Sequence, residues 1–245
     1  MAIIRLNNID LIYEIQNERR FKDIFVPYKG FNNNLIGSNK IQALKNLNIS
    51  INDGDKLGIV GHNGAGKSSL LKLIAGIYPP TSGELQVEGR IASLFELATG
   101  FEMEASGWDN IYLRGLMLGE TPKSIRAKTQ GIAEFSELGE YLNVPVKYYS
   151  SGMFMRLAFS ISTAVEPDIL LLDEVVAAGD AKFLKKAHLR MKELMDTVKI
   201  LVFVTHSMAS LKDFCNKCIW LNNGQIQMMG TPEEVSKAYL EHQGV

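Results

Sequence analysis

Long apolar runs are missing from this 245-residue sequence. A helix that crosses a membrane needs about 18 or more consecutive apolar residues, and the longest runs, near 169–172 and 200–204, are much shorter. The first residues also lack a basic stretch followed by an apolar run. We therefore expect no secretory signal, and the predicted location is the cytoplasm.

An excess of charge of one sign is also lacking, since 26 Lys and Arg against 27 Asp and Glu leave a net charge of −1. A protein that works mainly on nucleic acid carries many basic residues that neutralise phosphates. We therefore expect no DNA or RNA partner. The hydrophobic content of 46% is too high for a disordered chain and is sufficient for a packed core.

Cysteine is scarce, and the two that occur, Cys215 and Cys218, have the C-x-x-C spacing of zinc ligands or of a redox pair. A tetrahedral zinc site needs four ligands, and no second Cys or His pair lies at ligand spacing. A thioredoxin-like pair would open a helix after a strand, whereas this pair lies between a helical stretch and a strand. Packed, reduced thiols are therefore expected.

Strands and helices alternate along the sequence, which favours an α/β fold with a mostly parallel sheet. Strands are expected at 3–6, 9–13, 41–51, 56–60, 84–87, 91–95, 169–172, 200–204, 218–221 and 225–228. Helices are expected from the glycine-rich loop to about 75, within 106–139, at 153–165, at 207–214 and after 231. Three cap signals mark expected helix starts: Ser106 and Asp109 form a capping box, and Thr121 and Thr231 each precede a proline.

The strongest motif is a phosphate-binding loop between a predicted strand and a predicted helix. Its glycines turn backbone amides towards phosphate oxygens, Lys67 supplies a charge for the β and γ phosphates, and Ser68 offers a hydroxyl to Mg²⁺. The residues expected to contact nucleotide here are Gly61, His62, Asn63, Gly64, Ala65, Gly66, Lys67, Ser68 and Ser69. The loop therefore predicts a ligand with β and γ phosphates, together with Mg²⁺.

A phosphate loop of this kind needs a carboxylate at the end of a neighbouring buried strand. The apolar run 169–172 ends in Asp173 and Glu174, so we predict that Asp173 binds Mg²⁺ and that Glu174 polarises the attacking water. His206 follows the strand 200–204 and is interpreted as a sensor of the γ phosphate. The turn 149–153 opens another helix and is a second candidate anion site.

Together these motifs resemble the nucleotide-binding domain of an ABC transporter over nearly the whole chain. The family's Walker A motif matches 61–68, its signature matches 149–153, its Walker B motif matches 169–174, and its D-loop matches most clearly at Asp180. The resemblance implies a P-loop α/β fold with an antiparallel β part and an inserted helical subdomain. It implies a single domain over 1–245, with a RecA-like core at about 1–95 and 156–245 and the helical subdomain at about 96–155.

The resemblance also implies a homodimer, because family members pair head to tail and hold each ATP between Walker A of one protomer and the signature of the other. In this sequence the signature residues that would contact ATP are Ser150, Ser151 and Gly152. The family places an aromatic residue against adenine, for which Tyr13 is the candidate. Because the stretch 14–40 is longer than in many relatives, Phe25 or Tyr28 could take that role instead. That stretch is either a surface loop or a contact for a membrane subunit.

Departures from the family pattern narrow the subfamily. Ser151 replaces a glycine and Met153 replaces a glutamine in the signature, and Glu96 occupies the usual glutamine position after the strand 91–95. A carboxylate at that position could bind Mg²⁺ or its water directly. The signature and the stretch 89–101 look like those of ATPases that export bacterial O antigens, capsules and teichoic acids.

The leading hypothesis is therefore an ATP-hydrolysing motor subunit on the cytoplasmic face of a bacterial membrane. Its expected partners are a polytopic membrane subunit and a lipid-linked polysaccharide, with O antigen first among the cargoes. Some relatives continue into a C-terminal sugar-binding domain, which is not expected here because the sequence ends after the helix at 231. The alternatives are an ABC ATPase for another cargo and an ABC ATPase that does not act in transport.

Overall fold

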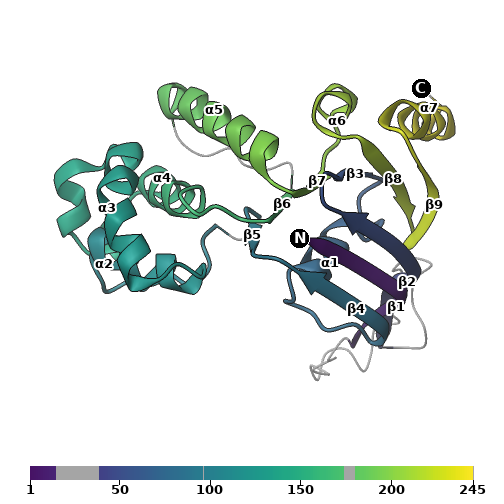
Figure 1. Cartoon of the computed structure of the whole chain (residues 1–245), viewed down its shortest axis with the longest axis horizontal. Coiled ribbons are helices and arrows are strands. Elements are labelled where there is room, and N and C mark those ends of the chain that lie inside the picture. The colour runs from purple at the N-terminus through teal and green to yellow at the C-terminus, as the bar shows by residue number, and fades with distance from the viewer. Residues whose placement is uncertain (15–38, 96, 174–179, 245) are drawn as a thin grey trace, which may run out of the picture. The chain divides into compact units, whose positions relative to one another are not determined.

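The computed structural model describes residues 1–14, 39–95, 97–173 and 180–244 of the chain (Figure 1). The chain divides into two compact units. Unit 1 consists of Met1–Ala2, Asp53–Lys56 and Gly89–Phe203, and unit 2 consists of Ile3–Asn52, Leu57–Glu88 and Val204–Val245. No helix in the described ranges is both long enough and apolar enough to cross a membrane.

Unit 2 contains an antiparallel sheet of three strands in the order β2-β1-β4. The strands are β1 (Ile3–Glu14), β2 (Lys40–Asn52) and β4 (Ser82–Glu88). The sequence predicts two short strands where β1 is one continuous strand. A register shift between Leu6 and Ile9, with Asn8 at a φ of 51°, explains the difference, because a bulge interrupts the alternation of polar and apolar residues without ending the pairing.

The second part of unit 2 is built around β8 (Lys217–Asn222), which pairs in parallel with β3 (Lys56–Val60) and antiparallel with β9 (Gln225–Gly230). Helix α1 (Lys67–Ile74) follows β3, and α6 (Met208–Phe214) and α7 (Pro232–Gln243) lie side by side next to β8 (Figure 1). The apolar residues between these strands and helices are Val60, Leu211, Cys218, Val235 and Tyr239.

Both cysteines lie in or beside this apolar cluster as reduced thiols, as the sequence predicts. Cys218 is fully buried, and burial, assisted by the neighbouring Cys215, raises the pKa of its thiol to about 12. A thiol with such a pKa stays protonated at neutral pH and packs as a small apolar group.

Unit 1 contains the strands β5 (Ile91–Ser93), β6 (Ile169–Asp173) and β7 (Ile200–Val204) in that order, with β5 and β6 parallel. Helix α5 (Ala181–Thr197) lies between β6 and β7 in sequence and is absent from the predicted elements. Asp180 caps its first turn, and Phe183, Ala187 and Leu194 are buried along one face.

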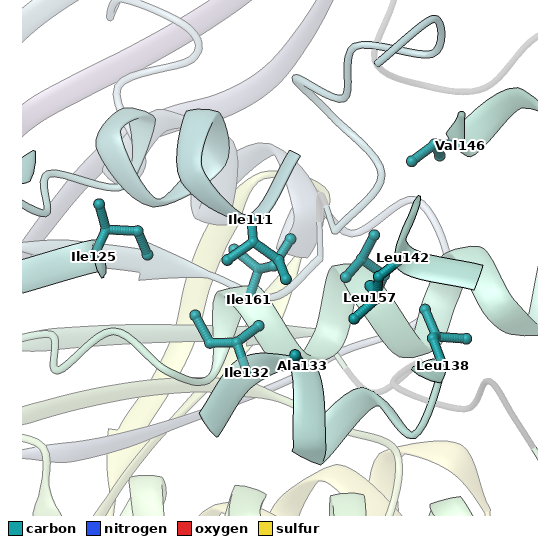
Figure 2. Close-up of a cluster of buried hydrophobic side chains, with 9 residues drawn as sticks. All are labelled: Ile111, Ile125, Ile132, Ala133, Leu138, Leu142, Val146, Leu157 and Ile161. Atoms are coloured by element: carbon teal, nitrogen blue, oxygen red, sulfur yellow. The ribbon is translucent and has the colours of Figure 1, made fainter. Parts of the chain in front are cut away.

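The helical part of unit 1 consists of α2 (Gly107–Met117), α3 (Pro122–Ser136) and α4 (Ser151–Ser162), with short 3-10 turns at Gly139–Asn143 and Val146–Tyr148. The predicted capping box at Ser106 and the predicted cap at Thr121 are both confirmed. Side chains from the three helices and the turns converge on one core, drawn in Figure 2: Ile111, Ile125, Ile132, Ala133, Leu138, Leu142, Val146, Leu157 and Ile161. Parallel strands, an antiparallel sheet and a separate helical core confirm the predicted α/β class.

Candidate active site

The phosphate loop lies in unit 2 between the end of β3 and the start of α1. Gly66 takes the place before the first helical residue with a φ of 106°, a left-handed conformation that residues with a side chain rarely adopt. A Cβ atom at this position would lie 2.7 Å from the carbonyl oxygen of Ala43. The glycine is therefore required both by the backbone conformation and by the close approach of β2.

Lys67 is the first residue of α1, and its side chain folds back into the loop. Its Nζ donates hydrogen bonds to the carbonyl oxygens of Gly61 at 2.6 Å and His62 at 3.0 Å, and the residue is only 8% exposed. The loop backbone thus holds the ammonium group at its centre. Ser68, the next residue, lies exposed in the first turn of α1.

The turn between β8 and β9 holds the loop from the side. His62 Nε2 lies 2.9 Å from Asn222 Oδ1, and the backbone N–H of Gly224 donates to the carbonyl oxygen of Ala65 at 2.9 Å. The sequence predicts strands at 218–221 and 225–228 on either side of this turn, but not the role of the turn as a support for the loop. Asn63 and Gly64, at the tip of the loop, are exposed.

Tyr13 lies against the start of α1. Its hydroxyl donates to Ser69 Oγ at 3.1 Å, and its ring meets that of Tyr78 edge-on at a centroid distance of 5.2 Å. Tyr13, the predicted adenine partner, therefore lies in β1 and contacts the first turn of α1, the helix that begins at Lys67. Phe25 and Tyr28, the alternative partners, lie outside the described residues.

His206 lies in the same unit and is exposed. The preceding residue, Thr205, is buried, and its backbone N–H is directed at the carbonyl oxygen of Ile59 at 3.5 Å. Ile59 lies in β3, just before the phosphate loop. His206 therefore directly follows a residue that lies beside the end of β3.

Asp173 is the last residue of β6, in unit 1. The backbone N–H of Leu94 donates to the carbonyl oxygen of Leu171 at 3.0 Å, so β5 and β6 run in register up to the same edge. Glu96 and Glu174 follow these two strand ends in sequence and lie outside the described residues.

The predicted second anion site is the first turn of α4, also in unit 1. The Ser150 side chain caps the helix by accepting a hydrogen bond from the backbone N–H of Met153 at 3.2 Å. Ser151 is exposed and Gly152 is half-buried. A pocket of about 500 Å³ opens over this turn and is lined by Glu137, Leu138, Tyr141, Ser150, Ser151, Gly152, Met153, Arg156 and Asp180.

Asp180 connects this pocket to helix α5. One carboxylate oxygen accepts from the backbone N–H of Phe183 at 2.9 Å, and the other pairs with Arg156 Nη2. The N–H of Phe183 and the charge of Arg156 outweigh the effect of burial and hold the pKa of Asp180 below its usual value. The carboxylate is therefore charged and oriented beside the first turn of α4. The remaining D-loop positions, 177–179, lie outside the described residues.

The comparisons with known proteins all indicate the same family. The model of the family described as "ABC transporter" matches residues 44–177. The chain is 46% identical over 186 residues to the O-antigen export system ATP-binding protein RfbE of Yersinia enterocolitica, covering 76% of this chain and 78% of the relative. It is 35% identical over 240 residues to an O-antigen export system ATP-binding protein RfbB of Klebsiella pneumoniae, covering 97% of each chain.

Another relative is longer. The chain is 46% identical to the RfbB protein of Myxococcus xanthus over 82% of its own length but spans only 46% of that protein. Among solved structures, the ATP-binding cassette MJ0796, whose dimer was determined with ADP and phosphate bound, is 23% identical with a TM-score of 0.67, covering 94% of this chain and 98% of the cassette. This structural similarity supports the P-loop fold.

Proposed function

We propose, from the premise that this chain belongs to the ABC transporter family of ATP-hydrolysing subunits, that it powers the export of a lipid-linked surface polysaccharide from a bacterium. O antigen is the cargo that we propose first. The single observation that supports O antigen as the cargo is the similarity to an ATP-binding protein named for O-antigen export, which extends over 97% of each chain. The proposed place of work is the cytoplasmic face of the membrane, bound to a polytopic membrane subunit.

ATP would bind at the phosphate loop in unit 2. The buried Nζ of Lys67, held by two loop carbonyls, would exchange those contacts for β and γ phosphate oxygens. Tyr13 would stack on adenine. The hydrogen bond from its hydroxyl to Ser69 supports this role, because it holds the ring beside the first turn of α1. The backbone amides of the loop would complete the phosphate site, since the left-handed glycines turn them inward.

Mg²⁺ fits the chemistry of the residues that we propose for it. Ser68 offers a hydroxyl oxygen and Asp173 a carboxylate oxygen, which are the hard donors that this ion prefers, and Glu96 offers a further carboxylate. When bound, Mg²⁺ would neutralise charge on the phosphate oxygens. Glu174 would take a proton from the attacking water, and His206 would bind the γ phosphate and connect it to strand β7.

The signature turn would bind the ATP held by a second copy of the chain. The pocket beside Ser150, Ser151 and Gly152, with the oriented Asp180 on its rim, supports a binding role for this surface. We propose a homodimer with two composite sites, in which each chain is a single nucleotide-binding domain. In that domain 96–155 would be the helical subdomain, and 1–95 and 156–245 the RecA-like core.

Teichoic acid is the principal alternative cargo. The chain is 41% identical to the teichoic acids export ATP-binding protein TagH of Lactococcus lactis, over 84% of its own length and 45% of that protein. Capsule polysaccharide is a further candidate cargo within the same class of lipid-linked polymer. The source bacterium's own polymer decides between them.

The test is a deletion of the gene in the bacterium that encodes this chain. We expect surface polysaccharide to disappear while lipid-linked polymer accumulates inside the cell. Expression of the wild-type chain in the deletion strain should restore export. The control variant Arg126→Met, which changes an exposed position in the helical part, should restore it equally well. Lys67→Met should not restore it. Unchanged surface polysaccharide in the deletion strain would contradict the proposed cargo, whereas loss of O antigen, capsule or teichoic acid would identify the polymer.

A further inference from the structure

Tyr78 is a second aromatic residue beside Tyr13, in the segment of unit 2 that connects α1 to β4. Its ring meets the ring of Tyr13 edge-on, at a centroid distance of 5.2 Å and an interplanar angle of 72°. The Nζ atom of Lys72, on α1, lies 5.7 Å from the centre of the Tyr78 ring. Tyr78 is half-buried and lies outside the phosphate-loop motif at 61–68.

The chain before Tyr78 is anchored to the end of α1. Gly76 follows the helix in the left-handed conformation, with a φ of 74°, which turns the chain back along α1. The backbone N–H of Ile77 then donates to the carbonyl oxygen of Lys72 at 2.9 Å. The position of Tyr78 is therefore tied to the helix that begins in the phosphate loop.

The chain after Tyr78 is anchored to β1. The prolines at 79–80 restrict the backbone, and the N–H of Thr81 donates to the carbonyl oxygen of Asp10 at 2.8 Å. The backbone N–H of Ile12 donates to Thr81 Oγ1 at 2.9 Å. Tyr78 therefore has fixed neighbours on both sides, one in α1 and one in the strand that carries Tyr13.

The Tyr13 ring is consequently held at two points. Its hydroxyl donates to Ser69 Oγ, and Tyr78 contacts the ring itself. Two rings that meet edge-on do not stack on each other, so at least one face of Tyr13 is not covered by Tyr78, whichever ring supplies the edge. This arrangement fixes the ring and still leaves it able to stack on a planar ligand.

We infer that Tyr78 is a positioning residue for the adenine base, which acts by holding the Tyr13 ring in the orientation that stacking requires. This inference rests on the proposed role of Tyr13 in stacking on adenine. Loss of the Tyr78 ring would remove one of the two contacts that hold Tyr13, and stacking would weaken. The phosphates should bind as before, because Lys67 is held by carbonyl oxygens within the loop.

The test compares ATP with inorganic tripolyphosphate, which has three phosphates but no base, by titration calorimetry of the full chain without metal. Tyr78→Leu, which keeps an apolar side chain but removes the ring, should weaken ATP binding about 2–5-fold. Its affinity for tripolyphosphate should change less than about 1.5-fold. Tyr78→Phe, which keeps the ring, should bind ATP like the wild type.

The matched control is Tyr148→Leu. Tyr148 belongs to unit 1, is 69% exposed and also has a lysine over its ring, since the Nζ of Lys147 lies 5.2 Å from the ring centre. This variant should leave both affinities unchanged. An equal loss of ATP affinity in Tyr148→Leu and Tyr78→Leu would show that the loss is not specific to the tyrosine beside Tyr13, and the inference would be wrong.

Tyr13→Ala separates failure of this inference from failure of the proposed stacking. If Tyr13→Ala weakens ATP binding and Tyr78→Leu does not, Tyr78 has no positioning role and the stacking by Tyr13 stands. If Tyr13→Ala leaves ATP affinity at the wild-type value, both statements fail.

Two further measurements distinguish positioning from a general structural role. Under the inference, the double variant of Tyr13→Ala and Tyr78→Leu binds ATP no more weakly than Tyr13→Ala alone, because Tyr78 acts through Tyr13. A Tyr78→Leu variant that loses tripolyphosphate affinity as strongly as ATP affinity would contradict the inference, since the phosphate loop itself would then be affected. If Tyr78→Leu does not fold, Tyr78→Met gives the same comparison.

Discussion

Glu120 is a buried carboxylate whose removal should destabilise the protein measurably. Its side chain is 3% exposed and lies 3.0 Å from Arg90 Nη1 and 3.1 Å from Lys128 Nζ, and it also accepts a hydrogen bond from Ser124. Glu120→Gln keeps the shape and removes the charge, which leaves two cations without their carboxylate. Breaking a buried ion pair in this way costs about 3–5 kcal/mol.

The expected cost for Glu120→Gln is smaller, because the two cations are partly exposed. The side chain of Arg90 is 39% exposed and that of Lys128 is 28% exposed, so both can regain water when the carboxylate is lost. We therefore expect a loss of about 2–3 kcal/mol in the free energy of unfolding. For a chain of this size, that loss lowers Tm by about 4–12 °C.

The effect should also depend on pH. Burial raises the pKa of Glu120, but the hydrogen bonds from Ser124 and Lys128 and the charge of Arg90 outweigh burial and set the pKa below its usual value. A carboxyl group whose pKa is lowered by folding stabilises the protein fully above the unfolded-state pKa, about 4.3. The difference between wild type and variant should therefore be complete at pH 7 and shrink as the pH falls below about 4.

Thermal and urea unfolding followed by circular dichroism at pH 7 and at about pH 3, below the unfolded-state pKa, provide the measurement. The matched control is Glu104→Gln, because Glu104 pairs with Lys147 at the surface with a side chain that is 70% exposed. An exposed pair of this kind contributes at most about 1 kcal/mol. Equal losses in Glu120→Gln and Glu104→Gln at pH 7 would refute the assignment of a stabilising buried network.

Substitutions at three further residues, Lys67, Tyr13 and Ser150, test the nucleotide sites. Lys67→Met should lower ATP affinity at least about 100-fold in titration calorimetry, because two charge-assisted contacts of about 1.5–3 kcal/mol each are lost; an unchanged affinity would exclude a phosphate role. Tyr13→Ala should weaken ATP binding about 5–10-fold while Tyr13→Phe, which keeps the ring, does not; equal affinities would exclude stacking. Ser150→Ala and Thr121→Ala should each cost about 1 kcal/mol of stability, because both residues cap helices. Only Ser150→Ala should also lower ATP turnover, by about 10-fold, and equal turnover in the two variants would exclude a signature role.

The elements that the sequence predicts well are those with local signals. The capping residues Ser106, Thr121 and Thr231 each begin a helix as expected, because a cap is made within one turn of chain. Helix α5 was missed although Asp180 caps it and Phe183 lies four residues before Ala187 on its buried face. The many lysines make the sequence of α5 polar overall, so the helical spacing of its few apolar residues is not evident.

The parts of the site that could not be predicted depend on contacts between distant segments. His62 and Asn222 are separated by 160 positions, and nothing in either local sequence indicates that they meet. Tyr13 and Tyr78 have the same property, because only tertiary packing brings their rings together. Motif spacing indicates the chemistry of a site, while the supporting contacts become visible only in the folded chain.

The most direct test of the composite ATP site is whether ATP causes the chain to dimerise. It is made by measuring the mass of the Glu174→Gln variant by light scattering in the presence and absence of ATP. Without its proposed base, this variant should retain ATP and accumulate as a dimer with twice the chain mass of 27.2 kDa, and it should return to a monomer with ADP. A variant that binds ATP yet stays monomeric at saturating nucleotide, or that hydrolyses ATP at the wild-type rate, would contradict the account.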